Sequence, residues 1–255
     1  MRYKVLIPAA GKGERAGLDF PKTLFPIEGV PIIVIILRRV QWLDEQPVVI
    51  VSPEGKQQIK ETLSRYELSA ELICQKIPKG MGDAVLHFEK SVFFQDCESL
   101  LLIWGDMFSV RERTLRKLIN LYEERGVDFA FPSVLKRKPY IYIERNKQGK
   151  VIDVKERREG DIVPDFGETD TGVFLFNKQK IFSVMKNNKE SLRGKITQEI
   201  NFLPVISELV KAGFEVEGYR IATEAETVGF NTLNDIKKAR ELNSSSNSQT
   251  NKEDI

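Results

Sequence analysis

The sequence predicts an α/β fold built on a mostly parallel β-sheet, and three observations predict it. Short β-rich segments alternate with longer amphipathic segments from residue 3 to residue 132, as in βαβ units. A glycine-rich turn follows the first β-rich segment directly. After residue 132 the β-rich segments are shorter and are joined by polar loops. We therefore expect a Rossmann-like sheet with an antiparallel extension, and no second independent core.

The predicted strands of the first half are short and rich in apolar residues. They are residues 3–7, 47–51, 70–74, 100–104 and 128–132. The amphipathic segments between them are predicted as helices, at about residues 31–43, 55–66, 82–94 and 111–125. The extension is predicted to hold strands at residues 140–145, 151–156 and 172–177.

The length of 255 residues, with 41% hydrophobic side chains, suits one large α/β domain or two small ones. The pattern shows no internal repeat, so we predict one domain over residues 1–243. Residues 244–255 are mostly Ser, Asn, Gln and Thr with a few charges, and are too polar to bury a core. We predict a disordered polar tail there.

The side-chain inventory excludes several kinds of site. His87 is the only histidine, and Cys74 and Cys97 are too far apart for a CxxC motif, which argues against a histidine and cysteine metal centre. The net charge of +2 and the pI of 8.4 give no indication of a nucleic-acid partner. The longest apolar run, residues 32–37, is too short to span a membrane. Two cysteines fit a reducing compartment, so we expect a cytoplasmic protein. The oligomeric state is not predicted.

The turn after the first strand has the features of a phosphate-binding loop. Gly11 and Gly13 leave the backbone bare, so that successive N–H groups can face phosphate oxygens. Arg15 and Lys22 add cationic side chains at the same end of the sheet. By itself, this spacing would favour a simple turn.

Two other glycine-loop motifs fit less well. Gly11, Gly13 and Ala16 satisfy a permissive dinucleotide-binding pattern, but residues 17–21 contain Gly, Asp and Pro, which interrupt the required helix. A Walker A loop is excluded because Lys12 is followed by Gly13 instead of Ser or Thr.

Further blocks then follow in a characteristic order. They are AAGKGER at 9–15, PKTLFPIEGVPI at 21–32, Gln75 before GMGDAV at 80–85, WGD at 104–106, GKV at 149–151 leading to Glu156, ETDTG at 168–172 and VGFNT at 228–232. On these blocks the chain resembles the sugar-phosphate nucleotidyltransferase family, and is most similar to the uridylyltransferase domain that makes UDP-N-acetylglucosamine. The resemblance covers about residues 3–243 and implies a nucleotide-diphospho-sugar transferase fold of GT-A-like type. No hexapeptide repeats follow, so a stand-alone pyrophosphorylase is implied.

The resemblance also implies a reaction and a set of site residues. A sugar 1-phosphate oxygen attacks the α-phosphorus of UTP, and pyrophosphate leaves. The implied catalytic residues are Arg15 and Lys22, and the implied Mg²⁺ ligands are Asp106 and Asn231. The implied nucleotide-binding residues are Ala9, Ala10, Gly11, Gly13, Gln75 and Gly80. The implied sugar-binding residues are Trp104, Glu156 and Asp170.

Several of these residues also have a structural interpretation. Asp106 could cap the helix that begins near Arg111, and Asn231 could cap the final helix. Glu156 lies in a run of charges that would ordinarily face solvent. His87 lies in an apolar helical stretch and is interpreted as structural. Residues 136–138 (Lys-Arg-Lys) are interpreted as an exposed loop, with a contact to the substrate's phosphate as the second interpretation.

The chain departs from the family pattern at six positions, several of which surround the implied sugar site, while Glu14 lies beside the implied phosphates. They are Glu14, Met81, Trp104, Phe108, Ile141 and Asp170. The leading hypothesis is a Mg²⁺-dependent uridylyltransferase acting on a hexose 1-phosphate, with N-acetylglucosamine 1-phosphate as the best single candidate. Alternatives are a CTP-dependent cytidylyltransferase of a polyol or choline phosphate, a non-catalytic homologue that binds nucleotide or sugar phosphate, and a dehydrogenase.

Overall fold

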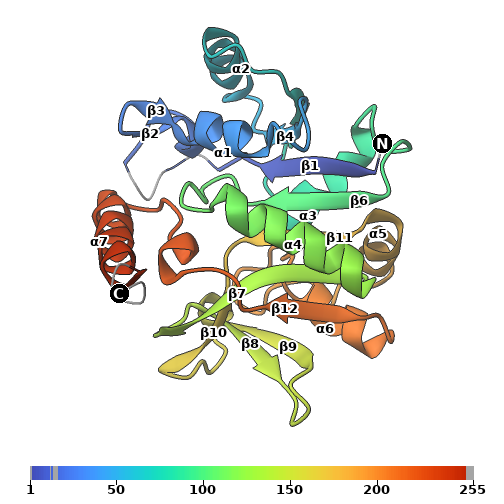
Figure 1. The fold of residues 1–255 in the computed structure, drawn as a ribbon. Helices are drawn as coiled ribbons and strands as arrows, with labels where there is room; N and C mark the ends of the chain where they lie inside the picture. Colours follow the sequence, from blue (N-terminus) through green and yellow to red (C-terminus); the bar gives the residue numbers. More distant parts are fainter. Residues whose placement is uncertain (1, 12, 14–16, 251–255) are drawn as a thin grey trace.

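A computed structural model describes residues 2–11, 13 and 17–250, with the backbone alone for residues 243–250. Its centre is an eight-stranded sheet with helices on both faces (Figure 1). The strand order is β10-β7-β11-β6-β1-β4-β5, and β12 pairs with β7. The strands are β1 (Tyr3–Pro8), β4 (Val48–Val51), β5 (Glu71–Cys74), β6 (Ser99–Ile103), β7 (Phe129–Arg137), β10 (Phe166–Asp170), β11 (Val173–Asn177) and β12 (Val216–Tyr219).

The half of the sheet formed by β5, β4, β1 and β6 is parallel, as the sequence predicts. Strand β11 then runs antiparallel to both β6 and β7, and β10 runs antiparallel to β7. The carboxyl ends of β1 and β6 therefore lie together at one edge. In parallel α/β sheets this edge is where ligands bind.

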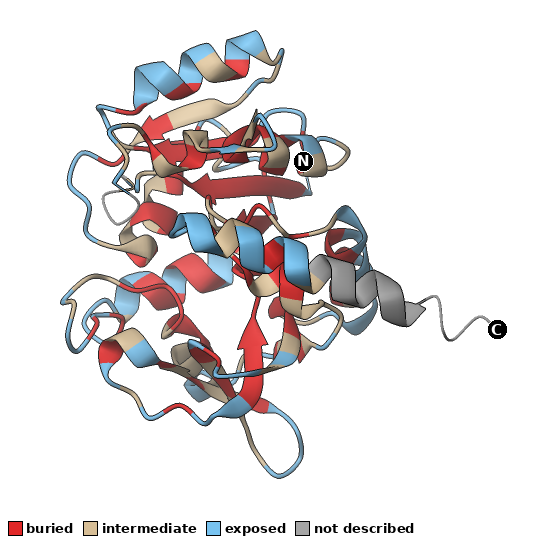
Figure 2. Ribbon diagram, turned by 90° about the vertical axis from the view of Figure 1, so that its left-hand side faces the viewer, coloured by how far each residue is buried: buried red, intermediate tan, exposed pale blue. Residues whose placement is uncertain are grey.

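The apolar core lies on both faces of the sheet because successive strand residues point to opposite sides. In β1, Val5 and Ile7 pack on the face covered by α1 (Ile32–Val40), α2 (Lys56–Arg65) and α4 (Glu112–Arg125). Leu6 packs on the face covered by α3 (Met81–Leu86), α5 (Lys178–Asn187) and α6 (Val205–Lys211). Figure 2 shows buried strands at the centre and helices whose outer sides are exposed.

Two small antiparallel sheets complete the fold. Strands β8 (Ile141–Arg145) and β9 (Val151–Glu156) form a hairpin, which confirms the predicted antiparallel extension. Strands β2 (Pro26–Ile27) and β3 (Val30–Pro31) form a short ladder before α1. None of the described helices is long and apolar enough to cross a membrane.

The structure differs from the predicted elements in several places. The predicted helix 82–94 is α3 followed by a 3-10 turn (His87–Lys90), which ends at Ser91, whose hydroxyl binds the Glu71 carboxylate instead of continuing the helix. Strands β10 and β12 and helices α5 and α6 were not predicted. Helix α7 (Leu233–Thr250) continues through residues 244–250, where the composition predicts a disordered tail.

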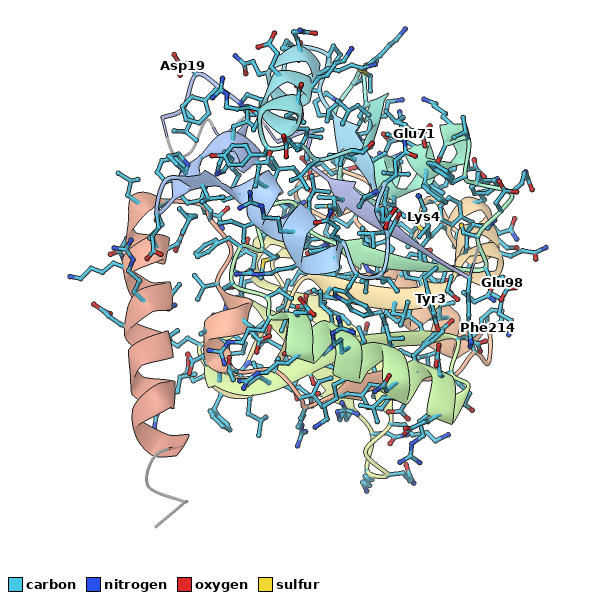
Figure 3. All side chains as sticks on the ribbon, turned by 45° about the horizontal axis from the view of Figure 1, so that its top comes forward. Tyr3, Lys4, Asp19, Glu71, Glu98 and Phe214 are labelled. Atoms are coloured by element: carbon cyan, nitrogen blue, oxygen red, sulfur yellow. The ribbon has the colours of Figure 1, made fainter. Side chains whose placement is uncertain are left out.

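A buried ion pair lies at the opposite end of β1 from the glycine loop. Lys4 is fully buried, and its Nζ is 3.0 Å from Asp44 Oδ1 and 3.5 Å from the centre of the Phe93 ring. Its neighbour Tyr3 points to the other face of the sheet (Figure 3). The pair joins β1 to the connection between α1 and β4.

Candidate functional site

A cleft of about 550 Å³ opens beside the carboxyl ends of β1 and β6. Its walls also include the ends of β9 and β10 and the segment that precedes α7. The predicted site residues that line it are Lys22, Trp104, Asp106, Glu156, Asp170 and Asn231. The structure therefore brings residues from five distant segments of the chain into one space.

At one end of the cleft, the Lys22 ammonium joins the two implied metal ligands. Lys22 Nζ is 2.6 Å from Asp106 Oδ2 and 2.8 Å from Asn231 Oδ1. The Lys22 and Asp106 side chains are 17% and 24% exposed, so both remain open to a ligand. The Asp106 carboxylate and the Asn231 amide oxygen thus both contact one cation, the Lys22 ammonium.

Backbone contacts fix the position of Asp106. The N–H of Gly105 donates to the carbonyl of Pro8 at 3.1 Å, and a Cβ on Gly105 would lie 2.5 Å from that oxygen. The N–H of Phe230 donates to the Asp106 carbonyl at 3.0 Å. The loop after β6 is therefore tied both to the end of β1 and to the segment that carries Asn231.

The capping interpretations of these two residues are wrong. Helix α4 begins at Glu112 with Arg111 as its N-cap, and the Asp106 carboxylate binds Lys22 instead. At the start of α7, the Asp235 carboxylate accepts from the N–H groups of residues 231 and 232. The side chain of Asn231 is therefore free to face Lys22.

Two buried carboxyl groups also line the cleft. Glu156, at the end of β9, is 8% exposed, so its interpretation as a solvated charge is wrong. No hydrogen bond reaches its carboxyl group from the described residues. Burial raises the pKa of Glu156 to about 7, against the opposing effect of Arg158. Burial also raises the pKa of Asp170 to about 6, although its Oδ2 accepts the Gly172 N–H at 2.8 Å.

Two further polar atoms on this wall lack partners among the described residues. They are Trp104 Nε1 and Thr171 Oγ1, and both are buried. An unsatisfied buried polar group is unfavourable, so such atoms commonly mark contacts that a ligand completes. Trp104 thus lies where the sequence placed it, on the wall shared with Asp170.

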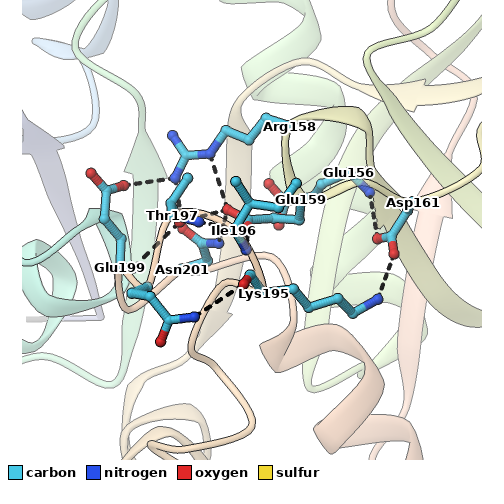
Figure 4. Close-up of polar contacts among 10 residues, drawn as sticks. Glu156, Arg158, Glu159, Asp161, Lys195, Ile196, Thr197, Glu199 and Asn201 are labelled. Atoms are coloured by element: carbon cyan, nitrogen blue, oxygen red, sulfur yellow. Dashed lines mark hydrogen bonds and ion pairs between the residues drawn. The ribbon is translucent and has the colours of Figure 1, made fainter.

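The sequence analysis missed a cluster centred on Glu159 (Figure 4). The Glu159 carboxylate accepts from the N–H of Ile196 at 2.9 Å, and from Thr197 Oγ1 and Asn201 Nδ2 at 2.6 and 2.9 Å. Burial alone would raise the pKa of Glu159, but these hydrogen bonds hold it at about 2. Glu159 therefore holds the loop 194–201 in place, and Asn201 of that loop lines the cleft.

The loop 194–201 also supports the implied nucleotide segment. The Gly82 N–H donates to Ile200 O at 2.8 Å, and a Cβ on Gly80 would lie 2.5 Å from the same oxygen. Gln75 Nε2 donates to Asp83 Oδ2 at 2.8 Å and to Gly80 O at 3.3 Å. Gln75 and Gly80 are thus adjacent, but neither lines the cleft described above.

The glycine loop is described in part. Ala9 is buried and its N–H donates to Ile50 O, Ala10 is half-buried, and Gly11 is exposed. Gly13 has φ +75°, the left-handed conformation for which glycine is suited. Arg15 and Glu14 lie outside the described residues. The interpretation of His87 as structural agrees with its position, since its Nδ1 contacts Asp83 O within α3.

Comparisons with known proteins agree with this architecture. The family described as "MobA-like NTP transferase domain" matches residues 5–161, more than half of the chain. The protein called bifunctional protein GlmU from Acholeplasma laidlawii is 26% identical over 243 residues, covering 94% of this chain and 51% of that protein. Its counterpart from Bacillus mycoides is 28% identical over 240 residues, covering 90% and 49%. The chain thus spans about half the length of these relatives.

Solved structures share the fold over nearly their whole length. A putative glucose-1-phosphate thymidylyltransferase from Bacillus anthracis superposes with a TM-score of 0.75 at 20% identity, covering 94% of each chain. The inositol-1-phosphate CTP transferase from T. maritima superposes with a TM-score of 0.72 at 18% identity, covering 96% of this chain and 95% of that one. The matched family, and a cleft that gathers the motif residues, show that the chain is a nucleotidyltransferase of the MobA-like NTP transferase domain family.

Proposed function

We propose that the protein is a Mg²⁺-dependent uridylyltransferase that transfers the uridylyl group of UTP to a hexose 1-phosphate. N-acetylglucosamine 1-phosphate is the best single candidate for the acceptor. The observation that carries the proposal is the contact of Lys22 with Asp106 and Asn231 in a cleft that Glu156 and Asp170 also line.

The reaction requires charge neutralisation more than proton transfer. An acceptor phosphate oxygen forms a bond to the α-phosphorus of UTP, the bond from that phosphorus to the bridging oxygen breaks, and pyrophosphate leaves. The attacking phosphate is largely dianionic at neutral pH, since its second pKa is about 6. No general base is needed, and positioning with electrostatic stabilisation supplies the rate enhancement. Lys22 is the described cation that lies nearest to the implied metal ligands.

The residues present fit a magnesium ion. Mg²⁺ in nucleotide enzymes is held by one or two protein oxygens together with substrate phosphates and water. Asp106 and Asn231 offer two such oxygens, and both already contact the Lys22 cation. Among the described residues, no three His, Cys, Asp or Glu side chains form a metal-binding cluster. Protein side chains alone therefore do not provide a complete coordination shell there. When bound, the ion would neutralise charge on the α-phosphate.

The second candidate is a cytidylyltransferase acting on a polyol or choline phosphate. Both hydrogens of the Gln75 amide are directed to Asp83 and Gly80, which leaves the carbonyl oxygen as the free polar atom. That oxygen can accept from the N3–H of uracil or from the 4-amino group of cytosine. The resemblance to the uridylyltransferase domain favours UTP, and the experiment below separates the two.

The test is a pyrophosphate-release assay that crosses four NTPs with sugar, polyol and choline phosphates, with and without Mg²⁺. We expect turnover that requires Mg²⁺ and is fastest with UTP and a hexose 1-phosphate. Turnover confined to CTP would support the second candidate. No turnover on any pair would support a binding protein and would refute the proposal.

A single variant tests the proposed metal ligand. We expect Asp106→Ala to lower kcat at least about 10²–10³-fold, because it removes charge stabilisation at the transferring phosphate. The exposed Asp165→Ala is the matched control and should retain wild-type activity. Both variants should keep the wild-type thermal transition, which differential scanning calorimetry would check. A near-wild-type rate for Asp106→Ala would contradict the assignment.

A further inference from the structure

Lys136 is a cation in the cleft, and it takes no part in the metal and nucleotide contacts proposed above. It lies near the end of β7, it is half-buried, and it lines the same cleft as Lys22 and Asp170. Its Nζ donates to Thr227 Oγ1 at 2.8 Å. No carboxylate of the described residues lies within ion-pair distance of it. Its neighbours Arg137 and Lys138 are exposed, so the structure separates Lys136 from the charged loop in which the sequence placed it.

The other cations of the cleft have partners. Lys22 is paired with Asp106 at 2.6 Å, and Arg158 is paired with Glu199 at 2.7 Å. The groups that act on Lys136 from a longer distance are Glu224 and Asp170, which favour its charge, and Lys238, which opposes it. Burial is the largest influence and lowers the pKa of Lys136. A half-buried ammonium without a counter-ion is unfavourable, and an anion in the cleft would relieve that cost.

The position of Lys136 points to one anion in particular. Thr227, its hydrogen-bond partner, ends the 3-10 turn (Glu224–Thr227) that leads directly to Asn231, which contacts Lys22. Asp170 interacts electrostatically with Lys136 and lies on the wall with Glu156. Lys136 thus lines the same cleft as the residues proposed for phosphoryl transfer and the carboxyl groups proposed to face the acceptor hydroxyl groups. A phosphate monoester whose hydroxyl-bearing part faces Glu156 and Asp170 would bring its phosphate into this cleft, where Lys136 is the cation without an ion-pair partner among the described residues.

We propose that Lys136 binds the phosphate of the acceptor substrate and directs it toward the nucleotide. This inference rests on the proposed function in one respect, namely that the acceptor is a phosphate monoester. The ammonium acts as a single point charge on the dianion. It reduces the repulsion between the acceptor phosphate and the triphosphate, and it leaves the chemistry at the α-phosphorus to the Lys22 end of the cleft.

The test compares Lys136→Met and Lys136→Arg with Arg137→Met, a control that removes one positive charge from the adjacent exposed position. Steady-state kinetics would use the NTP and acceptor pair that gives the highest wild-type turnover. For Lys136→Met we expect KM for the acceptor to rise roughly 10- to 100-fold, as for loss of a charged hydrogen bond. We expect KM for the NTP to stay within about twofold of wild type, Lys136→Arg to retain part of the acceptor affinity, and Arg137→Met to match wild type.

Other outcomes would overturn the assignment. An unchanged acceptor KM in a folded Lys136→Met variant would show that the residue does not bind the acceptor. A rise in KM for the NTP alone would place Lys136 on the triphosphate instead. If Lys136 served only to neutralise Asp170, its removal would move the acidic limb of the pH profile and leave the acceptor KM unchanged at pH 8. Thermal unfolding of each variant would confirm that it is folded.

Binding measurements separate a failure of this inference from a failure of the proposed function. If wild type turns over no substrate pair, the proposed function fails, and calorimetric titration with inorganic phosphate and with glucose 1-phosphate still tests Lys136. We expect wild type and Arg137→Met to bind both probes and Lys136→Met to bind them at least tenfold more weakly. Equal affinity of all three proteins, or no binding to wild type, would refute the role of Lys136.

Discussion

Glu156 and Asp170 are buried carboxyl groups with no cation of the described residues within ion-pair distance. Burial raises the pKa of Glu156 to about 7 and that of Asp170 to about 6. The native state therefore binds protons more tightly than the unfolded chain at both sites. The contribution of these two groups to the free energy of unfolding should fall as pH rises from about 4 to about 7. Such a cost in stability is typical of residues retained for ligand binding.

We expect Glu156→Gln to stabilise the ligand-free protein at pH 8 by an amount on the order of 2–3 kcal/mol, because the variant no longer has to ionise a buried group. At pH 4.5 the difference should largely vanish, since wild-type Glu156 is then protonated in the native state. Urea denaturation at both pH values would measure it, with the exposed Glu45→Gln as the control. An equal difference at both pH values would contradict the raised pKa of Glu156.

At the scale of elements, the loop 194–201 depends on a single carboxylate. Glu159→Gln keeps the shape of the side chain but removes the charge that accepts from Ile196, Thr197 and Asn201. We expect a loss of about 1–3 kcal/mol in the free energy of unfolding at pH 7. Because the pKa of Glu159 is held at about 2, this contribution should be lost between about pH 4.5 and pH 2.

The same variant should affect both substrates, because the loop contacts the Gly80 segment on one side and supplies Asn201 to the cleft on the other. We expect KM to rise for the NTP and for the acceptor, with kcat less affected. Glu190→Gln, which alters a surface ion pair with Arg193, is the control and should change neither KM. Wild-type KM values for Glu159→Gln would show that the loop is held by other contacts.

Most elements with an apolar pattern could be predicted from the sequence, and those with a polar pattern could not. The apolar runs of β1, β4 and β6 predicted the parallel sheet correctly. Strand β10 was missed because its sequence, Phe-Gly-Glu-Thr-Asp, looks like a loop. In the structure, Glu168 of β10 is buried against Arg145 and Arg220, which are distant in sequence. The sequence pattern around a charged residue cannot show that its side chain forms ion pairs with residues more than 20 positions away.

The residues of the candidate site also fall into two groups, those that the sequence predicted and those that it did not. The motif blocks predicted that Lys22, Asp106 and Asn231 would come together, and the structure brings them together. Glu159 and Lys136 each lie in a run of charges, where composition alone favours solvent exposure. The burial of Glu159 depends on the position of the loop 194–201 beside the end of β9, and that of Lys136 on the position of Thr227 beside the end of β7. Both depend on tertiary structure.

At the scale of the whole molecule, the ion pair of Lys4 and Asp44 lies at the amino end of β1, away from the cleft. We expect Asp44→Asn to lower the free energy of unfolding by about 3–5 kcal/mol, because it leaves a fully buried ammonium without its counter-charge. Urea denaturation would measure this loss, and the exposed Asp96→Asn should be neutral. Activity per folded molecule should stay at the wild-type level. A matching loss of kcat would show that the two ends of the sheet are coupled.

The antiparallel strand β11 has a consequence for how the molecule can move. It pairs with β6, whose end carries Asp106, and with β7, which carries Lys136 and pairs with β10. A rotation of one half of the sheet against the other would break those ladders. The spacing between Asp106 and Lys136 is therefore set by the folded sheet before any ligand arrives. Ligands then enter and leave through movements of surface loops and side chains, and a compound that contacts both residues would bind a largely preformed cleft.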